Sequence, residues 1–270
     1  MIISALAFSL LNVFVKYLKD FNIFQIVFFR SLGTLLFTIP LLKTKRIPLL
    51  GNKRGLLLAR GFIGFLAMLF FFLSLRYLNA GTAVSIRYLS PIIAAFLAIF
   101  YLKEKIKPIQ WLFFFGAFVG VLILKGFENQ FSVLGLIYIS ISTVLTGFVF
   151  VLIRKIKRAD HSLVIVNYHM IISLVISGLI AVFYWKQPSF VEFLLLLGLG
   201  VFGFFAQYFM TSALQTIDIN IITPFKYFEV IFTLGIGVIW LNEEYTLLSL
   251  SGILLILVCL TFNALLKKTN

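Results

Sequence analysis

LLLARGFIGFLAMLFFFLSL, residues 56–75, returns 139 residues later as LLLGLGVFGFFAQYFMTSAL, residues 195–214. The match extends without a gap over residues 24–125 and 163–264. Repetition at a fixed offset over so long a stretch predicts that the chain contains two copies of one structural unit.

Rare polar residues coincide in this overlay, which apolar composition alone does not explain. Arg87-Tyr88 coincides with Lys226-Tyr227. A background of leucine, isoleucine and phenylalanine supplies charged residues and tyrosines too rarely for shared hydropathy to produce such pairs. We therefore predict a duplication and place its two units at residues 1–127 and 132–270.

Composition indicates an integral membrane protein. The chain is 62% hydrophobic and 12% charged, with a mean hydropathy of +1.12, whereas an average soluble domain is roughly 25% charged. Ten apolar segments approach the ~20 residues that a helix needs to cross a bilayer. They lie near residues 1–15, 24–42, 56–75, 82–101, 109–124, 133–153, 163–184, 193–213, 219–241 and 247–266. We predict an all-α membrane protein with ten transmembrane helices.

The two units are expected to be inverted relative to each other, because each holds five of the ten segments. After an odd number of crossings, the second unit starts on the opposite side of the membrane and so has the opposite orientation. Many transporters place a binding site between two repeats related in this way. With the N-terminus inside, Glu104 then lies at the inner surface and Glu243 at the outer one.

The net charge of +14 follows membrane topology rather than a nucleic-acid surface. Positive residues concentrate in the loops of one side, which the positive-inside rule assigns to the cytoplasm. Fifteen fall in these inner loops: Lys43, Lys45, Arg46, Lys53, Arg54, Arg60, Lys103, Lys105, Lys107, Arg154, Lys155, Lys157, Arg158, Lys267 and Lys268. Five fall in outer loops: Lys16, Lys19, Arg76, Lys125 and Lys186. Both termini are expected in the cytoplasm, with the chain in a bacterial inner membrane.

The first apolar segment begins later than its counterpart in the second unit and has no basic leader. This pattern favours an internal start at Met1. A cleaved signal peptide, the rival interpretation, would need a charged leader and a small-residue cleavage site.

These features resemble bacterial members of the drug/metabolite transporter superfamily, which are built from two EamA domains. The resemblance is carried by Arg30, Pro91, Leu102-Lys103-Glu104, Gly116 and Gly120, and in the second unit by Leu241-Asn242-Glu243 and Gly252. The chain departs from the scheme at Val230, which stands where the first unit has Pro91, and at His169, which replaces Arg30. The resemblance implies ten helices, alternating access, and a central cavity walled by the first, third, fourth, sixth, eighth and ninth helices.

Charged residues inside apolar segments are the first candidates for a binding site, because a charge near the bilayer centre costs roughly 2.5–3.5 kcal/mol. Arg87 and Lys226 lie in segments that enter from opposite sides. We expect each to reach the cavity and to hold a carboxylate or phosphate, with Tyr88 and Tyr227 beside them. Snorkelling to the headgroups is the alternative.

Glu229 follows Lys226 by three residues, a spacing that brings two side chains to one helical face. The two can therefore pair. The pair either neutralises two buried charges, or opens when an anion takes the lysine or when Glu229 accepts a proton.

Arg30 and its counterpart His169 are expected to be structural. An arginine in this position can bond to backbone carbonyls of a neighbouring helix or reach the outer headgroups. Histidine titrates near neutral pH, but a single membrane histidine is more often a hydrogen-bonded packing residue.

A polar stripe in the eighth segment predicts one polar wall of the cavity. Its residues follow a helical i, i+1, i+4, i+5 pattern, and they are Gln207, Tyr208, Thr211 and Ser212. Their counterparts are all apolar: Met68, Leu69, Phe72 and Leu73. Such a cavity suits an amphiphilic organic solute better than a bare ion, and Asn12 is a further candidate contact.

Glu104 and Glu243 follow the fourth and ninth segments, where each is either an exposed loop charge or a gating group that bonds to neighbouring helix ends. Pro91 and Pro224 lie inside those segments and predict kinks, since proline removes a backbone hydrogen bond. Kinked helices beside a central site would serve as hinges.

The function predicted from these residues is secondary transport of a small organic metabolite or amphiphilic compound, with an anion favoured. Nothing matches the G-x-x-x-x-G-K-[ST] phosphate loop, so no nucleotide is expected as energy source, and no cofactor or metal site is expected either. The competing interpretations are a non-transporting receptor or assembly factor and a membrane-embedded lipid-modifying enzyme. Expected partners are the solute and membrane lipids, with a homodimer left open. The one cysteine, Cys259, is expected to pack in an apolar run.

Overall fold

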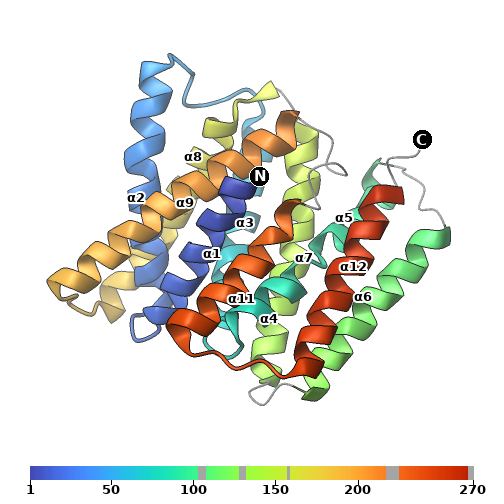
Figure 1. Ribbon diagram of the computed structural model, residues 1–270. Coiled ribbons are helices and arrows are strands. Elements are labelled where there is room, and N and C mark those ends of the chain that lie inside the picture. Colours follow the sequence, from blue (N-terminus) through green and yellow to red (C-terminus); the bar gives the residue numbers. More distant parts are fainter. Residues whose placement is uncertain (103–107, 128–131, 157–158, 217–224, 267–270) are drawn as a thin grey trace.

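A computed structural model shows an all-helical molecule (Figure 1). The structure describes residues 1–102, 108–127, 132–156, 159–216 and 225–266. Its helices are α1 (Ile2–Tyr17), α2 (Ile23–Thr44), α3 (Arg54–Ser74), α4 (Ala80–Arg87), α5 (Ser90–Leu102), α6 (Pro108–Phe127), α7 (Val133–Ile156), α8 (Ser162–Ala181), η2 (Val182–Tyr184), α9 (Phe190–Thr216), α11 (Phe228–Leu241) and α12 (Leu247–Leu266). The predicted all-α class is confirmed.

Length and hydropathy place most of these helices in a membrane. Five of them, α2, α3, α7, α8 and α9, are each long and apolar enough to cross a bilayer, and α1, α6, α11 and α12 hold shorter apolar stretches. Many large apolar side chains remain exposed on the outside of the bundle, among them Phe115, Leu179, Phe183, Ile239 and Leu247. An apolar exterior of this kind suits contact with lipid.

The predicted segment at residues 82–101 is divided into two helices. α4 ends at Arg87 and α5 begins at Ser90. Pro91 lies in the first turn of α5, where its missing N–H costs no helical hydrogen bond. The kink expected at Pro91 is therefore a complete break. In the second half, α11 begins directly after Tyr227, so a helix end adjoins the tyrosine of each repeat.

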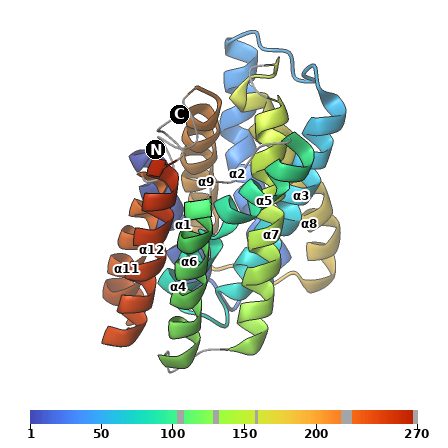
Figure 2. The same cartoon turned by 90° about the vertical axis from the view of Figure 1, so that its right-hand side faces the viewer.

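The two halves run in opposite directions and interleave. α1 runs from the N-terminus toward the lower end of the bundle in Figure 1, whereas its counterpart α7 runs upward. Helices of one half contact helices of the other, with α2 on α8 and α9, α3 on α7 and α8, and α1 on α9 and α11. α6 and α12 pack against each other at one side (Figure 2). The predicted pair of inverted repeats is confirmed.

Glycines permit the closest of these inter-repeat contacts. A Cβ atom on Gly200 of α9 would lie 2.3 Å from the Cα atom of Gly33 on α2. The Thr34 hydroxyl donates a hydrogen bond to the Gly200 carbonyl at 3.1 Å. Small residues let membrane helices approach until their backbones touch, so α2 and α9 are joined where the two repeats meet. Cys259 of α12 likewise packs against Gly116 of α6.

Candidate functional site

A cavity lined by residues of both repeats lies between the helices of the bundle. Its walls come from α1, α3, α4, α7, α9 and α11, the helices that the family resemblance implied, with further residues from α2, α5 and α8. The charged residues that line it, with one histidine, are Arg30, Arg60, Arg87, His169, Lys226 and Glu229.

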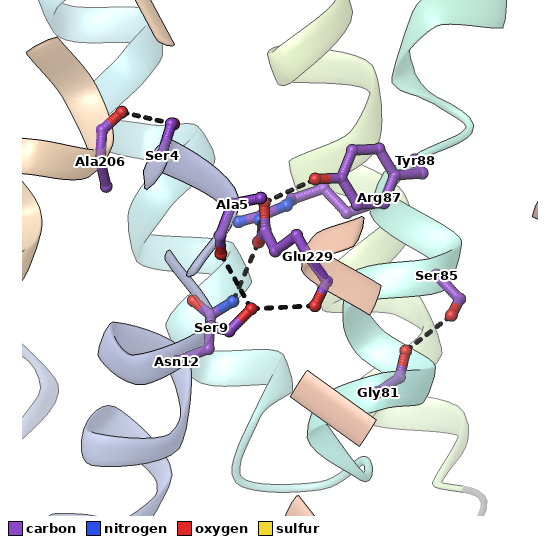
Figure 3. A network of polar contacts seen from close by, with 10 residues as sticks. All are labelled: Ser4, Ala5, Ser9, Asn12, Gly81, Ser85, Arg87, Tyr88, Ala206 and Glu229. Carbon is purple, nitrogen blue, oxygen red and sulfur yellow. Dashed lines mark hydrogen bonds and ion pairs between the residues drawn. The ribbon is translucent and has the colours of Figure 1, made fainter. Parts of the chain in front are cut away.

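Glu229 is the centre of a polar network that joins the two repeats (Figure 3). Its carboxylate accepts from Arg87 Nη2 at 2.6 Å, from the Tyr88 hydroxyl at 2.5 Å and from Asn12 Nδ2 at 3.1 Å. The Ser9 hydroxyl donates to the Glu229 carbonyl at 2.9 Å. Donors from α1 and from the end of α4 thus converge on the first turn of α11.

The ion pair between Glu229 and Lys226 that their spacing allows is not formed in the structure. The carboxylate bonds to Arg87 of the other repeat, and Lys226 Nζ instead lies 4.6 Å from the ring centroid of Phe150 and 5.6 Å from that of Tyr88. Lys226 precedes the start of α11, so the i, i+3 relation of a continuous helix does not apply to it. Tyr227 is not among the residues that line the cavity. Its ring packs against that of Tyr88, which does line it, with the two ring centroids 5.3 Å apart and the rings nearly perpendicular.

Two residues predicted to be structural or cytoplasmic lie in the cavity wall. Arg30, expected to bond to helix carbonyls or headgroups, is 2% exposed and lines the cavity beside the Phe72 ring. Arg60, counted as an inner-loop charge, is 1% exposed within α3 and donates to Gln207 Oε1 at 3.3 Å. His169 also lines the cavity, with Nδ1 3.3 Å from the Gly61 carbonyl oxygen.

The predicted polar stripe of α9 divides between two environments. Gln207 lines the cavity as expected. Tyr208 does not belong to its wall but stacks on Phe204 at 5.7 Å in a separate apolar cluster. Ser212 donates to the Ser162 hydroxyl at 2.9 Å. Adjacent residues on a helix point about 100° apart, so one stripe could not face the cavity throughout.

Glu243 joins the C-terminal part of α1 and the start of α4 to the segment that follows α11. It is 7% exposed, and its carboxylate accepts from Lys16 Nζ, from the Tyr245 hydroxyl and, at 2.8 Å, from the Ala80 N–H at the start of α4. Glu243 is therefore not an exposed loop charge but a buried group bonded to neighbouring helix ends, while its gating role stays a prediction. Glu104 and Pro224 lie outside the described residues.

Lys16→Met is expected to weaken the contacts of Glu243. Glu243 would keep the Ala80 and Tyr245 contacts but lose its counter-charge, and a buried charge-assisted hydrogen bond contributes about 1.5–3 kcal/mol. Thermal unfolding in detergent should show a lower Tm for Lys16→Met, with Lys19→Met, an exposed lysine three residues on, as control. Equal Tm values for the two variants would contradict a stabilising role for the Lys16–Glu243 pair.

The charge balance of the cavity favours an anion. Its described lining holds four cations, Arg30, Arg60, Arg87 and Lys226, and one carboxylate, Glu229. Among these described residues the arginines and the lysine exceed the carboxylate by three positive charges. Inside a membrane such charges are costly unless a partner neutralises them, and a negatively charged solute would supply that partner.

The model of the EamA-like transporter family matches residues 1–125 and again residues 133–265. The chain belongs to the EamA-like transporter family. Two matches on one chain agree with the duplication seen in the sequence and in the fold.

Relatives of this EamA-like transporter also carry transporter names. It is 27% identical to human solute carrier family 35 member G1, over 94% of this chain and 74% of that protein. It is 26% identical to the pseudopaline exporter CntI of Pseudomonas aeruginosa, over 97% and 94% of the two chains. It is 26% identical to the S-adenosylmethionine uptake transporter of Rickettsia prowazekii, over 86% and 80%.

A solved crystal structure of a protein shares the fold of this EamA-like transporter. The TM-score is 0.75 over 99% of this chain and 96% of the other, at 16% sequence identity. The family and these relatives together identify the chain as a membrane transporter of small metabolites.

Proposed function

We propose that this transporter binds a small organic solute with at least one acidic group in the central cavity and moves it by alternating access. The observation that carries the proposal is the excess of positive charge among the described residues that line the cavity between the repeats. The aromatic and apolar residues that share the lining, among them Phe8, Met68 and Phe71, favour an organic molecule over an inorganic ion.

The Glu229 network offers a way to couple binding to movement. Arg87 belongs to the first repeat and Glu229 to the second, and their ion pair joins the repeats beside the cavity. The negative charge of an acidic solute bound elsewhere in the cavity repels Glu229 and so weakens this link without taking its place. The breaks next to Tyr88 and Tyr227 give both repeats a place to bend, as in transporters whose sites are built at discontinuous helices.

In the proposed cycle, the contacts of Glu243 with Lys16, Ala80 and Tyr245 act as the gate at one end of the cavity. With both termini and most loop cations on the cytoplasmic side, that end faces outward, and the location is the cytoplasmic membrane of a bacterium. Arg60 lies in α3 and no longer counts as an inner-loop cation, but the inner loops still hold more positive residues than the outer loops. Gln207 and Asn12 then complete the polar contacts to the solute, while Tyr208 has no part in them.

Counterflow in proteoliposomes tests the proposal. Purified protein is reconstituted and offered labelled organic acids, their neutral amides and S-adenosylmethionine, which is included because one relative is named for its uptake. We expect exchange of at least one acid and little exchange of its amide. Arg87→Gln should slow this exchange, whereas Arg54→Gln, an exposed arginine on α3, should not. Failure of every labelled solute to exchange, or a preference for the amide, would overturn the proposal and revive the receptor interpretation.

A further inference from the structure

We propose that Arg30 and Arg60 together form the anion subsite of the cavity, which takes the carboxylate or phosphate group of the transported solute. The inference rests on the proposed transport function and deepens it, because it separates the residues that hold the acidic group from the Arg87–Glu229 pair that links the repeats.

The first support is a set of buried hydrogen-bond donors without acceptors. Nε and Nη1 of Arg30, and the same two nitrogens of Arg60, have no hydrogen-bond partner among the described residues. The two side chains are 2% and 1% exposed. Leaving a buried charged donor unpaired is among the costlier arrangements in a protein, and a ligand that supplies the missing acceptors removes the cost.

The second support is that both guanidinium groups lie next to residues one turn apart on α9. A Cβ atom on Gly203 would lie 3.3 Å from Arg30 Nε, and Arg60 Nη2 bonds to Gln207 four residues later. Positions i and i+4 share a helical face and lie about 6 Å apart. Arg30 from α2 and Arg60 from α3 therefore reach the same short stretch of the cavity wall.

Glycines let these basic side chains pack directly against the helix backbones. A Cβ atom on Gly64 would lie 2.9 Å from Arg60 Nη1 and 3.1 Å from His169 Nδ1, so a larger residue would displace both side chains. Gly64 and Gly203 are equivalent in the two repeats. Gly64 of α3 thus accommodates Arg60, and Gly203 of α9 accommodates Arg30.

No carboxylate of the described cavity lining is available to neutralise Arg30 and Arg60. Glu229 is the single acidic residue in the described lining, and its carboxylate is occupied by Arg87, Tyr88 and Asn12. An ionised carboxylate offers two oxygens with about four acceptor positions, and a phosphate offers more. Either group can satisfy the free donors of Arg30 and Arg60 without breaking the inter-repeat ion pair.

The test compares Arg30→Met and Arg60→Met with Arg54→Met, which makes the same change at an exposed position of α3. Without ligand, Arg30→Met and Arg60→Met should raise the Tm of the detergent-solubilised protein by a few degrees, because they remove unpaired buried charges. Arg54→Met should leave the Tm unchanged. A residue that held the fold together would lower the Tm instead, and that result would overturn the assignment.

Binding is then measured as the rise in Tm on adding sodium succinate or glycerol 3-phosphate at constant ionic strength, with succinamide and glycerol as neutral counterparts. At least one acid should stabilise wild type and Arg54→Met, and the more effective of the two identifies a carboxylate or a phosphate as the preferred group. Arg30→Met and Arg60→Met should need at least tenfold more of that acid. Stabilisation of these variants at wild-type concentrations, or no stabilisation of wild type by either acid, would overturn the subsite.

Counterflow separates this inference from the proposed function. If wild type exchanges a solute and both methionine variants exchange it equally well, the subsite is wrong while transport stands. If wild type exchanges nothing but acid binding still depends on Arg30 and Arg60, transport is wrong while the subsite stands.

Discussion

Glu229→Gln is expected to destabilise the protein by about 3 kcal/mol, the lower end of the cost of removing one partner from a buried ion pair. The lower end applies because the Arg87 side chain is still 18% exposed, whereas that of Glu229 is 2% exposed. Glutamine keeps the size of the side chain but leaves Arg87 without its counter-charge. Thermal unfolding in detergent should show the loss as a fall in Tm.

The double variant Arg87→Gln, Glu229→Gln provides the control. It removes both charges, so most of the lost stability should return, and the difference between single and double variants measures the coupling. Counterflow should nevertheless remain slow in both, because the inter-repeat link is absent. A Glu229→Gln protein that is as stable as wild type would contradict the ion pair, and one whose transport keeps the wild-type pH profile would exclude proton coupling through Glu229.

Gly200→Ala is expected to cost more than about 3 kcal/mol, beyond the usual range for overpacking. The new methyl group would lie 2.3 Å from Gly33 Cα and 2.6 Å from Gly33 C, both backbone atoms that no rotamer change can move away. α2 and α9 must separate, which also breaks the bond from Thr34. Folded yield and Tm are the measurements.

Gly198→Ala is the matched control on the same helix, because no atom lies within 4 Å of the position its Cβ would take. Alanine is preferred to glycine in a helix interior by up to about 1 kcal/mol, so Gly198→Ala should equal or exceed wild type in stability. Similar Tm values for the two alanine variants would show that the contact between α2 and α9 can relax.

The sequence was sufficient for the architecture because hydropathy and repetition are properties of the chain itself. The coincidence of Arg87-Tyr88 with Lys226-Tyr227 also pointed to the cavity, and the structure places Arg87, Tyr88 and Lys226 in its lining. Proline marked the place where the fourth crossing breaks, although a full break rather than a kink depends on neighbouring helices.

Partners across the repeats could not be predicted. Glu229 bonds to a residue 142 positions away, so a rule based on near neighbours selected Lys226 instead. Arg60 was missed because it lies close enough to the cationic loop to be counted with it. A signal was present, since Arg60 falls inside the repeated segment 56–75 and coincides there with the apolar Leu199, but only packing shows that its side chain turns inward.

Under the proposed alternating access, the unbalanced charge of the cavity is expected to make the transport cycle sensitive to voltage. Fixed charges in a site that opens to each side in turn experience the potential of that side, and each elementary charge is worth about 2.3 kcal/mol per 100 mV. With a negative cell interior, an empty carrier bearing three uncompensated positive charges is drawn toward its inward-facing state. A bound anion cancels part of that charge. The electrical free energy needed to change from the inward-facing to the outward-facing state is therefore smaller for the loaded carrier than for the empty one.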